Sequence, residues 1–200
     1  MELEARIESL LGRGDLKAAA TLAVEGYGPE VLGFLVVFLH DRADAEEVFA
    51  QACENLWSAL PGFAGRSSLR TWFYTLARHA AINLRRSPHG NPRRRASLSE
   101  ITDVAEQVRA RTRPHLRTDV KDRFAEIRDA LDEEDRALLV LRVDRGMSWN
   151  DVARVFAEGE STDEALSVVS ARLRKRFQYV KDEIRKRALA EGLLSRDDVE

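Results

Sequence analysis

The chain has 200 residues, 44% of them hydrophobic, and a formal net charge of −2 at pH 7. This composition suits one large or two small packed domains and excludes wholesale disorder. A single cysteine excludes an internal disulfide framework and a cysteine-rich zinc site, and is typical of the cytoplasm. The longest apolar run, 31–39, is too short to cross a bilayer, and the acidic N-terminus lacks the pattern of a signal peptide.

The near-neutral total conceals blocks of charge. Residues 58–99 hold eight arginines and no acidic residue, and residues 170–187 hold eight basic and two acidic residues. The segments before, between and after these blocks are net acidic. Two separate basic blocks, each on an expected helix, favour a polyanion partner such as nucleic acid over merely solvated helix faces.

Almost all of the chain has helical periodicity, without a strand pattern of useful length. Helices are expected over 2–11 and 15–39, the second broken by the glycines and proline of 26–29. An amphipathic helix is expected over 43–60, ended by proline and glycine. The stripe opposite its apolar face is polar and consists of Asp44, Glu47, Gln51, Asn55 and Ser58.

A further helix is expected over 68–86, with Ser67 marking its start. It contains arginines and no acidic residue. Its consecutive aromatics, Trp72, Phe73 and Tyr74, span about 200° of a helix and therefore cannot all face one core. We expect at least one of them at the edge of the basic face, where aromatic rings beside arginines suit the gripping of unstacked bases. The alternative is plain core packing.

The helical pattern stops near residue 88. Proline, glycine and asparagine follow, and the charged stretch 103–121 shows no core face, so 89–122 is expected to be a linker. The sequence therefore predicts an all-α protein with two small domains, 1–88 and 123–200, joined by a flexible linker.

The second domain has the order of a helix-turn-helix. Asp132 is expected to cap one helix and Ser148 the next, in a capping box with Asp151. The final helix is basic and amphipathic, with Ser170 and Arg174 placed on its polar side. Its apolar seam is continuous and consists of Leu166, Val169, Leu173, Phe177, Val180, Ile184 and Ala188.

No catalytic or metal-binding constellation is recognisable. The four histidines are scattered, without cysteine or carboxylate at ligand spacing, and there is no phosphate-binding loop. The acidic run 132–135 stands at a helix start, where the helix dipole accounts for it. Cys53 borders an apolar stripe and is interpreted as a core residue. We therefore expect no enzyme activity, no metal ion and no cofactor.

Residues 42–86 resemble region 2 of bacterial RNA polymerase sigma factors of the extracytoplasmic-function (ECF) type. The features that carry this resemblance are Asp44–Glu47, Leu56–Trp57, Phe63 with Gly65, Ser68–Trp72, Ala77–Arg78 and Arg85–Arg86. LDEEDRALLVLRVDRGMSWNDVARVF, with the later ARLRKRF, is similar to region 4 of the same family. Together the two resemblances cover residues 24–88 and 124–180.

The resemblance implies a sigma factor that binds core RNA polymerase and directs promoter-specific transcription initiation. Region 2 would dock on the polymerase clamp and open the −10 element, and region 4 would bind the −35 element and the polymerase flap. An anti-sigma factor is a further partner that members of this family usually have.

The resemblance also implies site residues. The polymerase-docking face would be Asp44, Glu47, Gln51 and Asn55. The contacts with the −10 region would be Phe63, Arg66, Ser67, Trp72, Arg78, Asn83, Arg85 and Arg86. The contacts with the −35 region would be Ser170, Arg172, Arg174 and Lys175.

The sequence departs from the family pattern in two places. The docking helix has Ala50, Gln51 and Cys53 where the family usually has Gln-Glu followed shortly by Phe. The turn at 158–167 is longer than usual, so either the turn or the front of the recognition helix is extended. Two alternatives stay open: a helix-turn-helix regulator, and a decoy sigma-like protein that forms no active holoenzyme.

Overall fold

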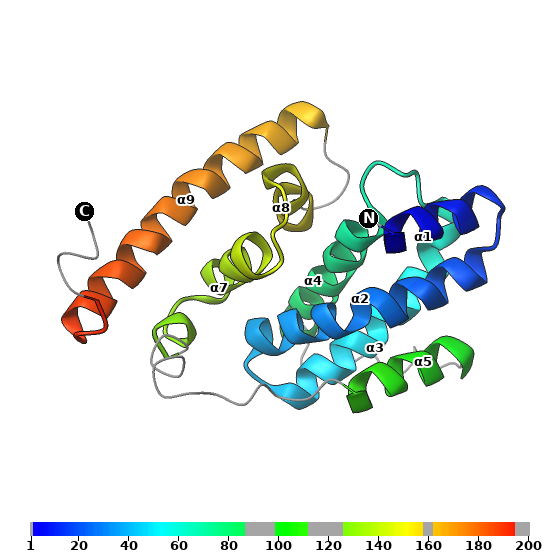
Figure 1. Ribbon diagram of the computed structural model, residues 1–200, viewed down its shortest axis with the longest axis horizontal. Coiled ribbons are helices and arrows are strands. Elements are labelled where there is room, and N and C mark those ends of the chain that lie inside the picture. Colours follow the sequence, from blue (N-terminus) through cyan, green and yellow to red (C-terminus); the bar gives the residue numbers. More distant parts are fainter. Residues whose placement is uncertain (1, 87–98, 112–125, 158–161, 195–200) are drawn as a thin grey trace. The chain divides into compact units, whose positions relative to one another are not determined.

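The computed structural model describes residues 2–86, 99–111, 126–157 and 162–194, which are helical throughout apart from short turns and contain no strand. The all-α expectation is confirmed. The chain divides into two compact units (Figure 1): Met1–Arg113 with Arg154–Phe156, and Pro114–Ala153 with Ala157–Glu200.

The first unit is built around one central helix. Helix α2 contacts every other α-helix of the unit along its length (Figure 1). Its core is aromatic: Phe34 lies edge-on to Tyr74 at 5.4 Å between ring centroids, and Phe49 lies 6.1 Å from Phe73. The elements are α1 (Glu2–Gly12), α2 (Leu16–Leu39), α3 (Arg42–Ala59), the 3-10 turn η1 (Leu60–Gly62), α4 (Leu69–Arg86) and α5 (Ser99–Arg111).

Helix α2 is continuous, so the expected break at 26–29 is wrong. Pro29 lies inside the helix, and Gly28 is a helical residue at which neighbouring helices pack closely. A Cβ atom at Gly28 would come within 3.1 Å of both Phe49 in α3 and Val108 in α5. The glycine therefore lets two neighbouring helices approach the α2 backbone.

The continuity of α2 also corrects the expectation about apolar length. This helix of 24 residues is long and apolar enough to span a membrane by length and composition alone. Half of its most apolar stretch is buried inside the protein, where α1, α3, α4 and α5 cover it. A helix that neighbours surround on several sides is expected to be apolar nearly all round.

Helices α3 and α4 both begin with side-chain caps. Asp41 accepts a hydrogen bond of 2.8 Å from the Asp44 N–H at the start of α3. At the start of α4 the cap is Ser68, whose Oγ accepts from the Thr71 N–H at 3.0 Å. Ser67 was expected to mark this start, but the helical backbone begins one residue later, so the side chain of Ser68 is the one that reaches the third N–H.

Helix α5 corrects the expected linker. Residues 99–111 form a helix that packs on α2 and α3 and buries Ile101, Ala105 and Val108. These three residues recur at spacings of four and three, which makes a narrow apolar stripe in a charged sequence. The rest of the expected linker, apart from these residues, lies outside the described part of the chain.

The second unit contains a helical turn at 126–129, α7 (Glu133–Leu139), the short π-helix η3 (Val140–Asp144), most of α8 (Trp149–Phe156) and α9 (Asp163–Ala190). The expected caps are confirmed. Asp132 accepts from the Asp135 N–H at 2.8 Å, and Ser148 accepts from the Asp151 N–H at 3.2 Å. The Ser148 hydroxyl also donates to the Asp151 carboxylate at 2.6 Å, so the two side chains of the expected capping box contact each other directly.

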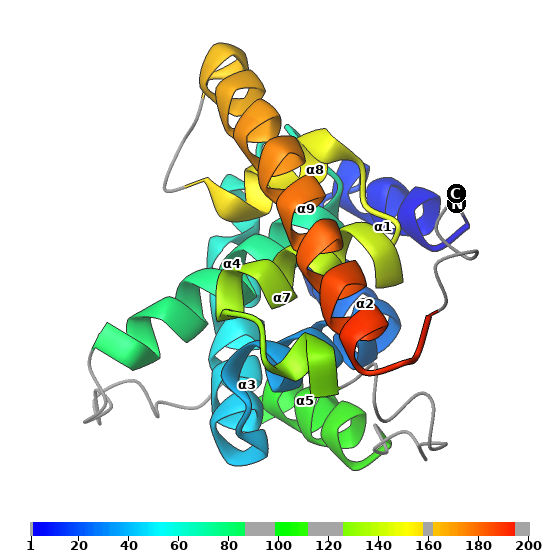
Figure 2. The same cartoon turned by 90° about the vertical axis from the view of Figure 1, so that its left-hand side faces the viewer.

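Helix α9 is one long rod beside α7 (Figure 2). Its expected seam is confirmed, because Leu166, Leu173 and Val180 are buried, and Val180 packs with Leu131 and Leu139. Thr162 caps the helix by accepting from the Ala165 N–H at 3.2 Å, so α9 starts well before the seam. Residues 163–167 of the expected long turn are therefore helical and extend the front of α9, and residues 158–161 lie outside the described part of the chain.

Candidate nucleic-acid and protein interfaces

The polar stripe of α3 lies on the surface of the first unit. Asp44 and Glu47 are exposed, and Gln51 and Asn55 are half-buried. The Gln51 amide donates to Asn55 Oδ1 at 3.1 Å and to Glu54 Oε2 at 3.3 Å, which aligns the C-terminal half of the stripe. The stripe is therefore an acidic patch followed by an amide patch, a surface suited to a protein partner.

Cys53 lies on the buried side of the same helix and is 1% exposed. Burial raises the pKa of its thiol well above the ordinary value, so the thiol stays protonated. This placement agrees with a core residue. The small thiol therefore fills core volume between α3 and its neighbours.

A loop joins η1 to α4 and carries three of the expected −10 residues. Arg66 is exposed, while Phe63 and Ser67 are half-buried. Gly65 has φ of 66°, a left-handed conformation that side-chain-bearing residues rarely adopt. The glycine therefore turns the chain between Phe63 and Arg66.

The aromatic triplet of α4 is divided between core and surface. Phe73 and Tyr74 are fully buried, and Trp72 is half-buried. The Trp72 ring lies 4.8 Å from the ring of Phe63, with an interplanar angle of 36°. The loop and the helix thus present one paired aromatic surface. Phe73 and Tyr74 pack in the core, and the gripping of a base at Trp72 stays a prediction.

The other expected −10 residues all lie in α4. Asn83, Arg85 and Arg86 are exposed in its last turns, whereas Arg78 is buried in the middle of the helix and does not lie on the exposed face where it was expected. Arg85 donates to the Phe38 carbonyl at 3.3 Å and lies 5.3 Å above the Phe38 ring. The structure therefore gathers three of these residues at one end of α4 and the loop residues before its other end.

Acidic residues from elsewhere in the chain contact the acid-free stretch at the first turn of α4. Arg70 binds Glu30 of α2 through Nε at 2.5 Å and Nη2 at 2.9 Å. The hydrogen bond to Glu30 raises the pKa of Arg70. Glu4 of α1 accepts a 2.7 Å hydrogen bond from the Leu69 N–H. Arg70 and Glu30 are 40 positions apart in the sequence, and Leu69 and Glu4 are 65 positions apart. Local sequence patterns therefore could not have predicted these contacts.

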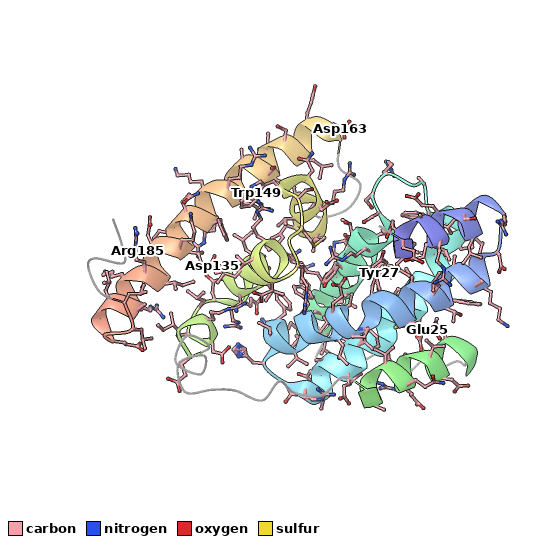
Figure 3. All side chains as sticks on the ribbon, viewed as in Figure 1. Glu25, Tyr27, Asp135, Trp149, Asp163 and Arg185 are labelled. Carbon is pink, nitrogen blue, oxygen red and sulfur yellow. The ribbon has the colours of Figure 1, made fainter. Side chains whose placement is uncertain are left out.

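Helix α9 presents basic side chains away from its seam. Arg172, Arg174 and Lys175 are exposed, as expected for residues that approach DNA. Figure 3 marks the start of α9 at Asp163 and a point near its end at Arg185. Trp149 of α8 packs beside α9, with its ring 5.5 Å from Phe177 and 5.9 Å from the Arg174 guanidinium.

Ser170 does not lie where sequence analysis placed it. It is 3% exposed, and its hydroxyl has no hydrogen-bond partner within the described part of the chain. Position 170 is four residues after Leu166 and three before Leu173, which puts it on the seam side of the helix. As the structure stands, Ser170 is a small packing residue rather than a DNA contact.

Arg176 ties α9 to the start of α7. Its Nε and Nη2 bind the two oxygens of Asp135, each at 2.6 Å, and Nη2 also binds Asp132 at 2.9 Å. The hydrogen bond to Asp135 raises the pKa of Arg176. The Asp135 side chain is nearly inaccessible and needs this partner, because an unpaired buried carboxylate is costly.

Metal binding has no support in the described segments, where no three histidine, cysteine or acidic side chains gather as ligands. The chemistry available at the surfaces above is instead that of recognition. A cationic, partly aromatic edge suits nucleic acid, and a polar stripe suits a protein.

Comparison with known proteins identifies one segment of the chain and several relatives. The model of Sigma-70 region 2 matches residues 23–89. The RNA polymerase sigma-H factor of Pseudomonas aeruginosa is 29% identical over 183 residues, covering 82% of this chain and 94% of that protein. The ECF RNA polymerase sigma factor SigX of Bacillus subtilis is 25% identical over 169 residues, with 82% and 86% covered. The ECF RNA polymerase sigma factor SigG of Mycobacterium tuberculosis is 29% identical over 189 residues, with 84% and 49% covered.

Proposed function

We propose that this chain, which belongs to the ECF sigma factors, binds core RNA polymerase through α3 and directs initiation by opening one promoter element with α4 while α9 holds another. The observation that carries the proposal is the match to region 2 over 23–89. That segment contains the polar stripe of α3, the paired rings of Phe63 and Trp72, and the basic end of α4.

Two regions divide the DNA-binding work. Residues 1–88 form region 2, now extended by α5, and residues 123–200 form region 4. Region 2 takes the −10 element, with the loop at 63–67 and the basic end of α4 as contacts. Region 4 takes the −35 element through Arg172, Arg174 and Lys175, whose exposure on α9 supports a helix entering the major groove.

The polymerase contact is the polar stripe of α3. Its exposed acidic half, Asp44 and Glu47, offers charge to a basic surface of the clamp. Glu47→Lys reverses one of these charges and is expected to weaken core binding while changing the stability of the free chain by about 0.5 kcal/mol or less. Glu8→Lys, an equal charge reversal at an exposed position of α1, is the control. Normal core binding by Glu47→Lys would remove the stripe from the interface.

The chain performs no chemistry of its own in this proposal, since the polymerase makes the RNA. It works in the cytoplasm without membrane insertion, with α2 as a core helix. An anti-sigma factor remains a further partner whose contact surface is not assigned to any residue.

Runoff transcription with purified core polymerase and a promoter library tests the function directly. We expect transcripts that start at a defined subset of promoters and require the chain. A helix-turn-helix regulator would bind DNA without core polymerase and direct no transcript, and a decoy would bind core polymerase and direct none. Either pattern would overturn the proposal.

A further inference from the structure

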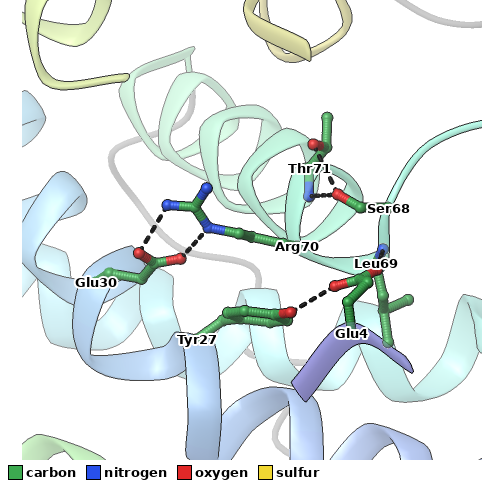
Figure 4. Close-up of polar contacts among 7 residues, drawn as sticks. All are labelled: Glu4, Tyr27, Glu30, Ser68, Leu69, Arg70 and Thr71. Carbon is green, nitrogen blue, oxygen red and sulfur yellow. Dashed lines mark hydrogen bonds and ion pairs between the residues drawn. The ribbon is translucent and has the colours of Figure 1, made fainter. Parts of the chain in front are cut away.

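A carboxylate of α1 holds the N-terminal end of α4. Glu4 accepts a hydrogen bond from the Tyr27 hydroxyl at 2.5 Å through Oε2 and from the Leu69 N–H at 2.7 Å through Oε1 (Figure 4). Leu69 is the first residue of α4, and Tyr27 belongs to α2. One side chain therefore joins three helices through both of its oxygens.

The contact has a clear physical basis at each oxygen. The first N–H groups of a helix have no partner within the helix, so an acceptor from another element satisfies one of them. A negative charge at this end also interacts favourably with the helix dipole. Burial and the hydrogen bond to Glu4 raise the pKa of Tyr27, so its hydroxyl stays protonated and donates to Glu4.

The neighbouring residues strengthen the attachment. Ser68 accepts from the Thr71 N–H at 3.0 Å, and Arg70 grips Glu30 of α2 with two hydrogen bonds. Figure 4 shows these contacts on successive residues of the same turn. The first turn of α4 is thus fixed to α1 and α2 by side chains rather than by apolar packing alone.

This turn follows directly on the loop at 63–68 that carries Phe63, Arg66 and Ser67. Phe63 packs on Trp72, which lies one turn into α4. A shift of the first turn would therefore move both members of the aromatic pair and the loop that leads into it. Positioning of this kind matters because a displaced base must meet its pocket within fractions of an ångström.

We propose that Glu4, with Tyr27, is a positioning residue for strand opening: it sets the start of α4 and thereby the loop at 63–68 that receives the displaced strand. The proposal rests on the proposed function, in which this loop takes part in opening the −10 element. Glu4 itself does not touch DNA. Its effect passes through the Leu69 N–H.

The test uses holoenzyme assembled from core polymerase and the full chain, on a promoter that the wild-type holoenzyme transcribes. Glu4→Ala removes both hydrogen bonds, and Tyr27→Phe removes one while keeping the ring. Glu8→Ala is the matched control, because it removes an exposed carboxylate from the same helix. Permanganate reactivity of thymines is measured on the duplex promoter, and binding of holoenzyme is measured on the same promoter with a mismatched, already open −10 element. Melting temperatures of the free chains are measured in parallel.

We expect Glu4→Ala to reduce opening of the duplex promoter about tenfold, as the loss of charge-assisted hydrogen bonds implies. Tyr27→Phe is expected to reduce it about threefold, because a single hydrogen bond is lost. On the pre-opened promoter both variants are expected to stay within about twofold of wild type, since capture no longer competes with base pairing. Glu8→Ala is expected to match wild type on both templates.

Two results would overturn the proposal. One is normal duplex opening by Glu4→Ala and Tyr27→Phe. The other is an equal loss on both templates together with a lowered melting temperature, which would mean that Glu4 only stabilises the fold. Failure of the wild-type chain to direct any transcript is a different result, because it contradicts the proposed function itself.

Discussion

Helices α4 and α9 are both basic and amphipathic, but their arginines differ in how far other helices of the chain contact them. In α4, Arg70 is bound by Glu30 and Arg85 lies against the end of α2 at Phe38. In α9, Arg172 and Lys175 are exposed, and the ion pair of Arg176 is made to α7 at the edge of the seam. One helix is enclosed by its neighbours, whereas the other is attached along one side.

The difference matches the two tasks in the proposed function. Opening DNA requires a surface whose geometry is set before the strand arrives, because every misplaced contact weakens the capture of the displaced base. Entering a major groove requires a helix whose outer face is accessible along several turns. The contacts of α4 provide the first property and the long exposed face of α9 provides the second.

The largest expected contrast concerns one phenylalanine in each helix. Phe73 of α4 is fully buried against Phe49, while Phe177 of α9 is half-buried beside Trp149. We expect Phe73→Ala to cost the first unit about 3–5 kcal/mol and Phe177→Ala to cost the second about half as much. Hydrogen exchange followed by mass spectrometry measures each unit separately. Equal losses would show that the two helices are enclosed to the same degree.

The ion pair of α9 is the next point of comparison. Arg176→Ala leaves the Asp135 carboxylate buried without its main partner, and we expect the second unit to lose roughly 2–3 kcal/mol of unfolding free energy. Arg172→Ala, at an exposed position four residues earlier in the same helix, is expected to cost about 0.5 kcal/mol or less. Urea unfolding of the two variants checks this pair. A small effect at Arg176 would mean that α9 is held by its apolar seam alone.

Much of this arrangement was predictable from the sequence, because it depends on local patterns. The seam of α9 and the caps at Asp132 and Ser148 follow from spacing and from residue type. The aromatic triplet of α4 was correctly expected to divide between core and surface. The resemblance to the family then supplied the partners.

The wrong predictions arose where distant residues decide the outcome. Gly28 and Pro29 suggest a turn locally, yet close packing by α3 and α5 keeps α2 helical. The apolar stripe of α5 is weak by itself, and the helix is part of the core only because this stripe packs on α2 and α3. Glu4 and Glu30 supply carboxylates to an acid-free stretch from two other helices, which no spacing in that stretch reveals.

Salt dependence tests whether the exposed face of α9 meets phosphate. Each phosphate contact adds about −0.9 to the slope of log affinity against log salt, so Arg172→Ala with Lys175→Ala is expected to flatten the slope by about 1–2 units. Lys186→Ala, an exposed position further along α9, is the control and is expected to leave the slope unchanged. Filter binding of holoenzyme to promoter DNA between low and moderate salt gives the slopes. An unchanged slope in the double variant would mean that this face is merely solvated.

The smallest expected effect is at Ser170. Because this residue is buried on the seam side, Ser170→Ala is expected to leave −35 binding within about twofold and the stability of the second unit within about 0.5 kcal/mol. Footprinting of the −35 element and urea unfolding provide the two readouts. Loss of −35 protection with normal stability would contradict the packing role and would indicate that Ser170 contacts DNA.

The central claim is that the loop before α4 and its aromatic edge open the promoter, separately from the grip of α9 on duplex DNA. The most direct measurement combines permanganate reactivity with −35 footprinting for holoenzyme that carries Phe63→Ala, Arg66→Ala and Ser67→Ala together. We expect strongly reduced thymine reactivity, with an unchanged −35 footprint and a melting temperature of the free chain close to wild type. Loss of opening and of the footprint together, in a chain with a lowered melting temperature, would contradict the claim.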